Sequence, residues 1–506
     1  MGRGQPDRRR VVQGLTALSG VAATGGAAAT AKRPNLVFFL GEGLRSDEFG
    51  FMGNRLLKTP HMDALAREGA VFRNAFVTNA LCLPSRASFL TGAWSHTTGA
   101  VTNEEATVPI GFRMVNDILR EGGYETAFLG KSHVSGALLD HPWDYYFGFK
   151  GQADYLNPTV TERIGSGEAT TRTYRDSYVD DLLTSRAVSW MEGRTTDKPF
   201  CLFLWFYAPH APFYRPRRML NRFNGAAVPI PKDFDEDLKN YPGRPRAVAE
   251  ATNKIGTTMV FFDAPRSLEE LVKDHYAGVE ANDENIGQVL EVVRRKGLME
   301  DTAILLSSDH GFFLGEHTFY DKRLMYEPSI RVPMILRYPK LVKPGRSPTE
   351  MVLNVDAAPT LLELAGLPVP PTMQGRSFLG LAEGRPHADW RTDWLYEYYE
   401  YPGYENVRPH RGVRTERYKY IHYFTEPQEY ELYDLQTDPG EDNNLYGQPK
   451  YADLTAKLTG RLEALRRETG DAYVYKPSRS PKPWLSFDPP GYQPPPWRPQ
   501  AIEKPK

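Results

Sequence analysis

Short apolar runs, each closed by a glycine or by polar residues, recur through the first two thirds of the chain. They cover residues 35–41, 125–130, 200–207, 304–308 and 332–337. Runs of this length that do not alternate with polar residues are typical of strands buried on both faces. Amphipathic helical patterns separate them, at residues 59–69, 112–122, 179–192 and 267–297. This alternation predicts an α/β fold with a large mixed, mostly parallel sheet flanked by helices.

The chain carries no marked excess of charge. Lys plus Arg number 62 and Asp plus Glu number 63 among 506 residues, which gives a net charge of −1. This balance argues against a nucleic-acid partner, so an anionic substrate would have to be bound by a local pocket. Only two cysteines are present, Cys82 and Cys201, which excludes a disulfide framework. Cys201 lies in an apolar run and is interpreted as a core residue.

The first 31 residues have the composition of an export signal rather than of a folded element. A basic start is followed by small, weakly apolar residues and by the sequence ATA at residues 29–31, which matches an A-x-A cleavage site. Arg8-Arg9 followed by two valines resembles a twin-arginine signal. We therefore expect a cleaved signal and a periplasmic or secreted protein, with a disordered basic tail as the alternative. No other segment is long and apolar enough to predict a membrane span.

The pattern changes near residue 386. Residues 394–399, 412–423 and 429–435 are aromatic, charged and alternating, which predicts a small antiparallel sheet with one face in water. An amphipathic helical pattern follows at residues 451–468, and Pro and Trp dominate from residue 476. The predicted organisation is an export signal at 1–31, a main domain at 32–388, a C-terminal subdomain at 389–475 and a Pro-rich tail at 476–506.

Polar side chains follow four of the predicted strands, at the point where each strand ends. In chain order they are Glu42, the group Lys131-Ser132-His133, His210 and the pair Asp309-His310. In α/β sheets, ligands bind beyond the carboxyl ends of the strands. One such residue is ordinary loop chemistry, but all four groups together predict a convergent site.

A further polar element, Cys82-Leu83-Pro84-Ser85-Arg86, is followed by the sequence LTG at residues 90–92. The pattern C-x-P-x-R is rare by chance in a chain with two cysteines. With its tail it resembles the signature of the formylglycine-dependent sulfatases, in which the cysteine is oxidised to an aldehyde. The resemblance extends over residues 34–470 through segments in the family's order: PNLVFFL, GKSH, APHAPF, SDHGFFLGEH, DKRLMYEPSIRVPMIL and ELYDLQTDPGEDNNL.

The resemblance implies a sulfuric ester hydrolase with an alkaline phosphatase-like fold, in which residues 32–388 are the catalytic domain. It also implies a formylglycine-generating enzyme as the partner that matures Cys82. A sulfate monoester is a resistant anion, so its hydrolysis needs cations and an activated nucleophile. One hydroxyl of the hydrated aldehyde would attack sulfur, and deprotonation of the second would expel the sulfate.

The resemblance implies one divalent metal, with Ca²⁺ expected and Mg²⁺ as the alternative. Its implied ligands are Glu42, Cys82, Asp309 and His310, and the ion would lower the pKa of the attacking hydroxyl. Sulfatases usually carry two consecutive aspartates after the first strand, whereas this chain has Glu42-Gly43. We expect that this departure weakens metal binding, because fewer anionic ligands surround the ion. The alternative is that Glu42 pairs with a neighbouring Lys or Arg and the metal is lost.

The remaining implied roles concern protons and the sulfate group. Asp309 would also take the nucleophile's proton, and Arg86 would hold the hydrated aldehyde. Lys131 and Lys322 would contact the sulfate oxygens. His133 would accept the proton of the second hydroxyl, and His210 would protonate the leaving alcohol. The competing interpretations are a surface ion pair for Arg86, solvated charges for the lysines and hydrogen-bonded loop residues for the histidines. Structural roles are expected for His96, His317 and His410.

Residues 397–423 resemble the matching segment of sulfatases that act on sulfated sugars, including N-acetylglucosamine-6-sulfatases. Their Arg, His and Tyr side chains suit sugar hydroxyls and carboxylates, although a solvated sheet edge has a similar composition. Two other functions stay open. One is a phosphate or phosphonate monoester hydrolase of the same superfamily, and the other is a catalytically silent glycan-binding protein that keeps the fold.

Overall fold

The computed structural model describes residues 32–103, 108, 112–134, 137–234, 243–255, 267–385, 387–403 and 405–478. The expected export signal and residues 479–506 of the expected tail lie outside this part. Within it, no helix combines the length and the apolar character needed to cross a membrane.

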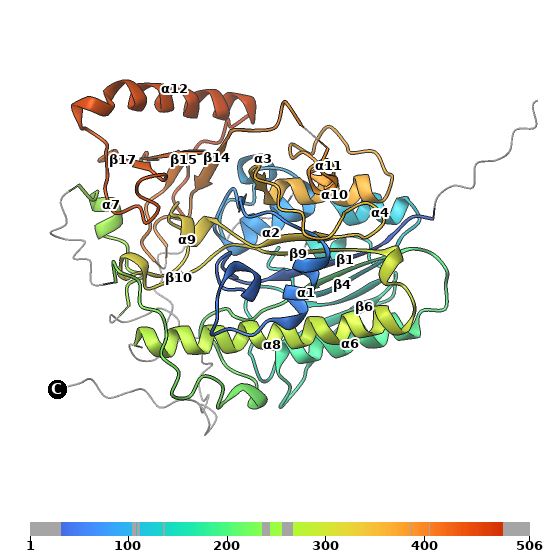
Figure 1. Cartoon of the computed structure of the whole chain (residues 1–506). Coiled ribbons are helices and arrows are strands. Elements are labelled where there is room, and N and C mark those ends of the chain that lie inside the picture. The colour runs from blue at the N-terminus through green and yellow to red at the C-terminus, as the bar shows by residue number, and fades with distance from the viewer. Residues whose placement is uncertain are drawn as a thin grey trace, which may run out of the picture. The chain divides into compact units, whose positions relative to one another are not determined.

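A nine-stranded sheet is the centre of the fold, with strand order β2-β12-β9-β1-β8-β4-β5-β6-β7 (Figure 1). The strands β9, β1, β8, β4 and β5 run parallel, and the outer strands are antiparallel to their neighbours. The bounds are β1 Asn35–Gly41, β2 Ala70–Val71, β4 Glu125–Lys131, β5 Tyr145–Phe149, β6 Thr159–Ile164, β7 Thr170–Thr173, β8 Phe200–Trp205, β9 Thr302–Ser308 and β12 Met334–Arg337. The predicted mixed, mostly parallel sheet is confirmed.

The two faces of the sheet carry separate apolar cores. In β1, Leu36, Phe38 and Leu40 pack into one core, whereas Val37 and Phe39 pack into the other. All seven residues of β1 are buried, as expected for a strand covered on both sides. Burial of β1 on both faces therefore explains why its sequence is an unbroken apolar run.

Helices cover both faces (Figure 1). On one side lie α1 (Pro60–Glu68), α6 (Val179–Gly193) and α8 (Leu268–Arg295), and on the other α2 (Cys82–Thr91), α4 (Val115–Glu121) and α10 (Ala357–Leu364). The long helix α8 begins with a capping box, in which Ser267 and Glu270 bond to each other's backbone N–H. The shorter helices and strands are α3 Ser95–Thr98, α5 Ala137–Asp140, α7 Arg246–Ala249, α9 Glu327–Ile330, α11 Leu379–Glu383, β3 Ala75–Phe76, β10 Phe313–Leu314, β11 Tyr320–Asp321 and β13 Val352–Leu353.

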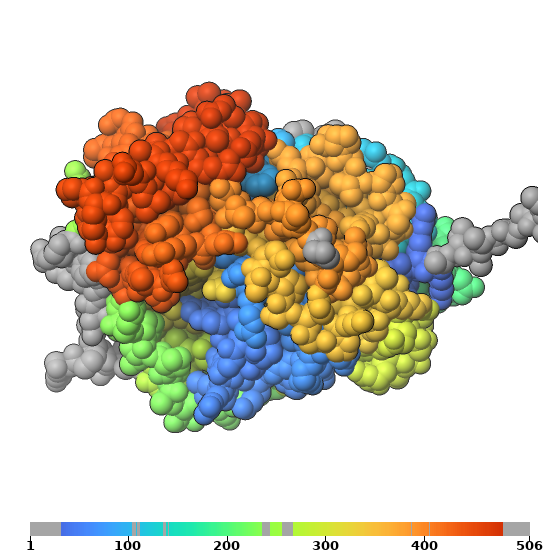
Figure 2. All heavy atoms as spheres, turned by 45° about the horizontal axis from the view of Figure 1, so that its top comes forward, coloured from blue at the N-terminus to red at the C-terminus, as the bar shows by residue number. Residues whose placement is uncertain are grey.

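A smaller sheet follows in the C-terminal part of the chain. Its four strands, in the order β14-β15-β16-β17, are antiparallel. Helix α12 (Ala452–Glu468) packs on this sheet through Leu458, Leu462 and Leu465. The strands are β14 Asp393–Tyr398, β15 His410–Thr415, β16 Tyr418–Tyr423 and β17 Glu429–Asp434. The predicted antiparallel sheet and its closing helix are confirmed, but the predicted face in water is not, because most residues of all four strands are buried. In Figure 2 these orange and red segments lie against the blue and green ones.

Three local predictions differ from the structure. The helix predicted at 112–122 begins only at Val115, because the Asp117 carboxylate bonds to the Met114 N–H and starts the helix there. The strand predicted at 412–423 is two strands joined by a tight turn, so one predicted element is a hairpin. The segment that starts at Cys82 forms helix α2, for which no helix was expected.

Candidate active site

The register of the parallel strands places the predicted polar groups side by side. Gly41 at the end of β1 pairs with Ser308 at the end of β9, and Leu40 pairs with Trp205 at the end of β8. The residues that follow these strands therefore emerge at one edge of the sheet. Helix α2 begins at the same place with Cys82, so segments far apart in the sequence meet in one buried cluster.

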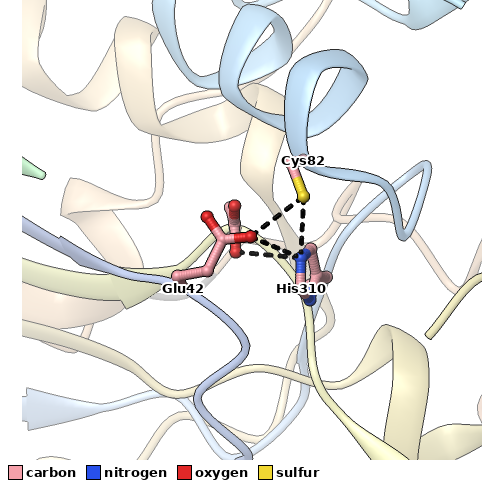
Figure 3. A group of neighbouring side chains, drawn as sticks. Glu42, Cys82 and His310 are labelled. Atoms are coloured by element: carbon pink, nitrogen blue, oxygen red, sulfur yellow. Dashed lines mark hydrogen bonds and ion pairs between the residues drawn. The ribbon is translucent and has the colours of Figure 1, made fainter. Parts of the chain in front are cut away.

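The centre of the cluster is made by Glu42, Cys82, Asp309 and His310. Figure 3 shows how the side chains of Glu42, Cys82 and His310 face one another. Sγ of Cys82 lies 2.9 Å from Oε1 of Glu42 and 3.5 Å from Nε2 of His310. Nε2 of His310 lies 3.4 Å from Oε1 of Glu42 and also 3.4 Å from Oδ1 of Asp309. All four side chains are buried, so four potential metal ligands face one another away from bulk water.

The second oxygen of each carboxylate is held by a cation. Arg86 donates from one guanidinium nitrogen to Oε2 of Glu42 at 2.6 Å and from Nε to Oδ2 of Asp309 at 2.8 Å. Lys131 lies 2.9 Å from the same Oε2 of Glu42. Each carboxylate is therefore fixed by its outer oxygen and presents its inner oxygen to the cluster. Because Arg86 is fully buried, its interpretation as a surface ion pair is wrong.

The imidazole of His310 is oriented in the same manner. Its Nδ1 lies 2.7 Å from the carbonyl oxygen of Gly311. A carbonyl oxygen only accepts, so Nδ1 carries a hydrogen and Nε2 faces the cluster. Metal-binding histidines usually have this arrangement, in which the second ring nitrogen donates to a backbone carbonyl or a carboxylate. The geometry of these four residues thus fits a divalent metal.

The charges of the cluster compensate one another. Burial raises the pKa of Glu42, but Lys131 and Arg86 outweigh burial and hold that pKa well below its ordinary value. Burial and the Glu42 carboxylate raise the pKa of Asp309 to about 7. Burial disfavours the charged form of His310, yet Asp309 raises the pKa of this histidine to about 9. A proton on Nε2 of His310 thus occupies the position that a cation would take.

The Cys82 thiol is set up to ionise. Burial raises its pKa and the Glu42 carboxylate raises it further, but the cations of Lys131 and Lys322, together with His310, hold the pKa well below its ordinary value. Cys82 is also the first residue of the ten-residue helix α2, and a helix N-terminus stabilises a thiolate. The other cysteine, Cys201, is buried in β8, where burial raises the pKa of its thiol.

Both lysines of the site are buried, which excludes the interpretation of solvated surface charges. Lys131 ends strand β4 and donates to Oε1 of Gln152 at 3.1 Å. Lys322 follows strand β11 and lies 2.9 Å from Oδ1 of Asp321, whose carboxylate raises the pKa of the lysine against the effect of burial. Two positive charges in a water-poor pocket suit an anionic ligand.

His133 and His210 lie beside the cluster and are both buried. Burial lowers the pKa of His133. Burial, followed by the charges of Lys131 and Lys322, lowers the pKa of His210 to about 4. Nε2 of His210 lies 3.9 Å from Oε1 of Glu42. Both imidazoles are therefore neutral near pH 7. A neutral imidazole can accept a proton as it stands, but it can donate one only after a bound anion has raised its pKa.

Several residues that support the site were not predicted. The Tyr207 ring stacks on His210 with a centroid distance of 5.3 Å, and Lys131 lies 5.4 Å from the same ring's centroid. Asp180 accepts from the backbone N–H groups of Tyr207 and Ala208, each at 2.8 Å, and so fixes the turn toward His210. Burial raises the pKa of Asp180 to about 7. Of the residues that hold the site residues in place, Asp321 alone had a signal in the sequence, because it is adjacent to Lys322.

Gly43 takes the position where a second carboxylate was expected from the family pattern. Its φ of +72° is in the left-handed region, and a Cβ at this position would lie 3.2 Å from the Phe312 ring and 3.5 Å from the His310 ring. Its N–H donates to Oδ1 of Asp309 at 3.1 Å. The backbone at this position thus supports Asp309, while the side chain that would reach the cluster is absent.

The three histidines assigned structural roles lie in packed environments. His96 pairs with Glu397 at 2.7 Å, and His317 lies 3.0 Å from Oδ2 of Asp233. His410 is enclosed by aromatic rings, including that of Tyr396 at a centroid distance of 5.5 Å, and burial lowers its pKa to about 4.

Comparisons with known proteins agree with the site. The sulfatase family profile matches residues 34–367, and the profile described as N-sulphoglucosamine sulphohydrolase, C-terminal, matches residues 315–468. An N-acetylglucosamine-6-O-sulfatase of Bacteroides thetaiotaomicron is 33% identical, and the match covers 87% of this chain and 87% of the relative.

Solved structures share the fold. BT4656, solved in complex with its substrate D-glucosamine-2-N,6-O-disulfate, is 32% identical with a TM-score of 0.80, and the match covers 87% of this chain and 99% of that one. A phosphonate monoester hydrolase of Agrobacterium radiobacter is 21% identical with a TM-score of 0.71, over 86% of this chain and 96% of that one, and shares the fold alone. The family profile and the relatives lead to one conclusion: this chain belongs to the sulfatase family and is a sulfatase.

Proposed function

We propose that this sulfatase removes sulfate from sulfated carbohydrates, using a formylglycine made from Cys82 and one divalent metal. Ca²⁺ is the proposed ion, with Mg²⁺ as the alternative. The observation that carries the proposal is the buried cluster itself, in which Cys82 lies between the inner oxygen of Glu42 and His310 while two buried lysines stand nearby. A nucleophile precursor, metal ligands and anion-binding cations are thereby combined in one pocket.

The proposed metal ligands are Glu42, Asp309, His310 and the group formed from Cys82. When bound, the ion would offset the charge of the sulfate, and the converted Cys82 would supply the attacking hydroxyl. Asp309 is proposed to take the proton of that hydroxyl. Arg86 keeps both carboxylates oriented toward the cluster through its two ion pairs. In the matured chain we also assign it a contact with the hydrated aldehyde.

The other residues are proposed to bind the sulfate and to move protons. Lys131 and Lys322 approach the sulfate oxygens as point charges. His133, neutral because burial lowers its pKa, accepts the proton of the second hydroxyl. His210 donates to the leaving alcohol. Its pKa of about 4 reflects burial and the two lysines, so a sulfate that neutralises both lysines raises this pKa and makes His210 an acid.

Two observations support a sugar as the alcohol part of the substrate. The relatives with the highest identity reported above act on sulfated glucosamines by name. In addition, the C-terminal sheet lies directly against the loop of Lys322, because the Tyr396 hydroxyl on β14 donates to the Arg323 carbonyl at 2.6 Å. The segment 397–423, with its Arg, His and Tyr side chains, therefore begins next to the sulfate-binding lysine.

Turnover of matched esters tests the reaction. The matured enzyme is expected to hydrolyse nitrophenyl sulfate faster than nitrophenyl phosphate, and sulfated glucosamines faster than either. Faster turnover of the phosphate would favour the phosphate or phosphonate hydrolase instead. Activity confined to aryl sulfates would contradict the sugar substrate.

Mass analysis of the peptide that contains Cys82 tests the nucleophile. The aldehyde is expected in chain produced together with a formylglycine-generating enzyme. An unmodified cysteine under those conditions would favour a silent glycan-binding protein. Cys82→Ala and Cys82→Ser are both expected to abolish turnover, and a Cys82→Ser enzyme that keeps near-native turnover would contradict the aldehyde mechanism.

The remaining proposals concern location and organisation. The basic, small-residue pattern of residues 1–31 supports cleavage of a twin-arginine-like signal and a periplasmic or secreted enzyme. The change of texture near residue 386 supports a catalytic domain at 32–388, a C-terminal subdomain at 389–475 and a Pro-rich tail at 476–506.

A further inference from the structure

We propose that the chain in which Cys82 is still a cysteine binds Zn²⁺ at the active site, through Cys82, Glu42, Asp309 and His310. The inference concerns the same cluster as the proposed function but the chain before conversion, and it does not require sulfatase turnover. The ion is bound by one atom from each residue: Sγ, Oε1, Oδ1 and Nε2. The state of Cys82 would then determine which metal the site takes.

The separations of Nε2 of His310 from the other three ligand atoms match a tetrahedral zinc site, and all four atoms lie within 4.8 Å of one another. Zinc–ligand distances of about 2.0 to 2.3 Å place neighbouring ligand atoms about 3.2 to 3.6 Å apart. Here Nε2 of His310 lies 3.5 Å from Sγ of Cys82, 3.4 Å from Oε1 of Glu42 and 3.4 Å from Oδ1 of Asp309. The shorter separation of 2.9 Å joins Sγ to Oε1 of Glu42. It is a hydrogen bond in which the thiol donates, and this separation lengthens when an ion replaces the proton.

The atoms around these ligands are already arranged for an ion. Arg86 and Lys131 hold Oε2 of Glu42, Arg86 holds Oδ2 of Asp309, and the Gly311 carbonyl accepts from Nδ1 of His310. Partners of this kind orient metal ligands and set which nitrogen of a histidine faces the metal. Three of the four ligands therefore need no change of rotamer to bind an ion.

The chemistry of the donors favours zinc over calcium. Calcium takes about six to eight oxygen ligands, whereas this set offers two inner carboxylate oxygens and no side chain from Gly43. A thiolate and an imidazole are ligands that suit zinc. Zn²⁺ with one thiolate and two carboxylates leaves a charge of −1, which the buried guanidinium of Arg86 offsets. Binding releases two protons to solvent, that of the Cys82 thiol and that on Nε2 of His310, because both atoms must be deprotonated to bind the ion.

Cobalt is the probe, because it replaces zinc and reports its ligands by colour. The full chain is produced in a host without formylglycine-generating enzyme, mass analysis confirms the intact Cys82, and chelator removes bound metal. Titration with Co²⁺ is expected to give one ion per chain, the intense visible bands of tetrahedral cobalt and a thiolate-to-cobalt charge-transfer band. Zn²⁺ is expected to abolish these bands and raise the melting temperature, whereas Ca²⁺ does neither.

The two cysteines supply matched variants. Cys82→Ser is expected to lose the charge-transfer band and to weaken Co²⁺ binding at least about tenfold, while Cys201→Ser keeps both. Melting in chelator shows that each variant is folded. A charge-transfer band that survives Cys82→Ser, an absent band in the parent chain, or stabilisation by Ca²⁺ equal to that by Zn²⁺ would overturn the inference.

The proposed function and this inference fail separately. Sulfate turnover by the matured enzyme without cobalt binding by the unconverted chain would refute the zinc site alone. Cobalt binding through Cys82 in a chain whose matured form leaves sulfate esters intact would refute the proposed function alone.

Discussion

Arg86 determines how the two carboxylates of the site face the cluster. It reaches Glu42, 44 residues away along the chain, and Asp309, 223 residues away. A planar guanidinium can bridge two carboxylates in this way, whereas a lysine ammonium cannot fix both orientations at once. Arg86 thus balances the charge of both carboxylates and sets the direction of their inner oxygens, and the role that we propose for it in metal binding follows from this orientation.

Gly43 stands where the family usually has an aspartate, and a single substitution tests what this difference does to metal binding. Gly43→Asp is expected to tighten Ca²⁺ binding to the matured enzyme at least about tenfold relative to Gly43→Asn, because only the aspartate adds an anionic ligand. Both variants bear the same backbone strain at φ +72°, which costs about 1 kcal/mol for a side chain other than glycine. Calcium titration by calorimetry measures the difference. Equal affinities in the two variants would show that no calcium ion sits beside residue 43.

The acid role proposed for His210 predicts a dependence on the leaving group. His210→Ala is expected to lower kcat about 10²- to 10⁴-fold on a sugar sulfate, whose alcohol needs a proton to depart. On nitrophenyl sulfate the expected loss is below about tenfold, because nitrophenolate departs unprotonated. Steady-state kinetics on both esters check this. Equal losses on the two esters would remove His210 from the acid role. Tyr207→Leu, which removes the stacked ring and keeps the imidazole, is expected to show the same leaving-group dependence with a smaller loss.

At the scale of elements, the ion pair of His96 and Glu397 joins α3 to β14. The Glu397 carboxylate outweighs burial and raises the pKa of His96 to about 9 from an ordinary 6.5. A raised pKa in the folded state means that the pair stabilises fully below pH 6.5 and loses this effect as pH rises through about 9. This difference between the two pKa values corresponds to about 3 kcal/mol of folding free energy.

Glu397→Gln tests this link. The variant is expected to lower the free energy of unfolding by about 3 kcal/mol at pH 6, with a difference from the parent that disappears toward pH 10. Denaturant unfolding across this range measures it. Glu463→Gln is the control, because its half-exposed pair with Arg466 should change stability by less than about 0.5 kcal/mol at any pH. A Glu397→Gln difference that stays constant with pH would contradict the raised pKa of His96.

The elements also show what the sequence can and cannot predict. The strand at Asn35–Gly41 was predictable because burial on both faces demands an unbroken apolar run. Helix α2 was not, since Pro84 and Ser85 in its first turn give no apolar periodicity. The hairpin of β15 and β16 was missed because its turn at Glu416-Arg417 lacks the usual Gly or Asn. The antiparallel direction of β12 depends on tertiary packing, which no local pattern encodes.

The candidate site likewise has features that could be predicted from the sequence and features that could not. That Glu42, Lys131, His210 and Asp309 meet could be predicted, because the carboxyl ends of parallel strands share one edge. Which partner each side chain takes could not, since contacts such as that of Tyr207 with His210 depend on rotamers and on the path of a loop. The roles of the individual residues stay predictions until the variants are measured.

At the scale of the whole molecule, the C-terminal sheet braces the segment on both sides of Cys82. The N–H of Glu397 on β14 donates to the Thr78 carbonyl at 3.0 Å, before the cysteine. The Trp94 indole donates to the Leu395 carbonyl at 3.2 Å, after it. Helix α2 is therefore held between the large sheet and the small one, and the position of Cys82 depends on both.

Distant segments supply the charges of the cluster, and this has a consequence for how the molecule opens. A site formed without one member would leave a buried charge unpaired, which costs about 3 to 5 kcal/mol. Loops around binding sites usually open on their own, but here the N–H of Gly43 donates to Asp309 at 3.1 Å and that of Leu44 donates to Ser308 at 2.8 Å. We expect these two amides to exchange hydrogen for deuterium as slowly as those of β1, and measurably faster exchange would contradict this. The loop after β1 would then open only when the whole chain unfolds, so its lifetime would be that of the folded chain.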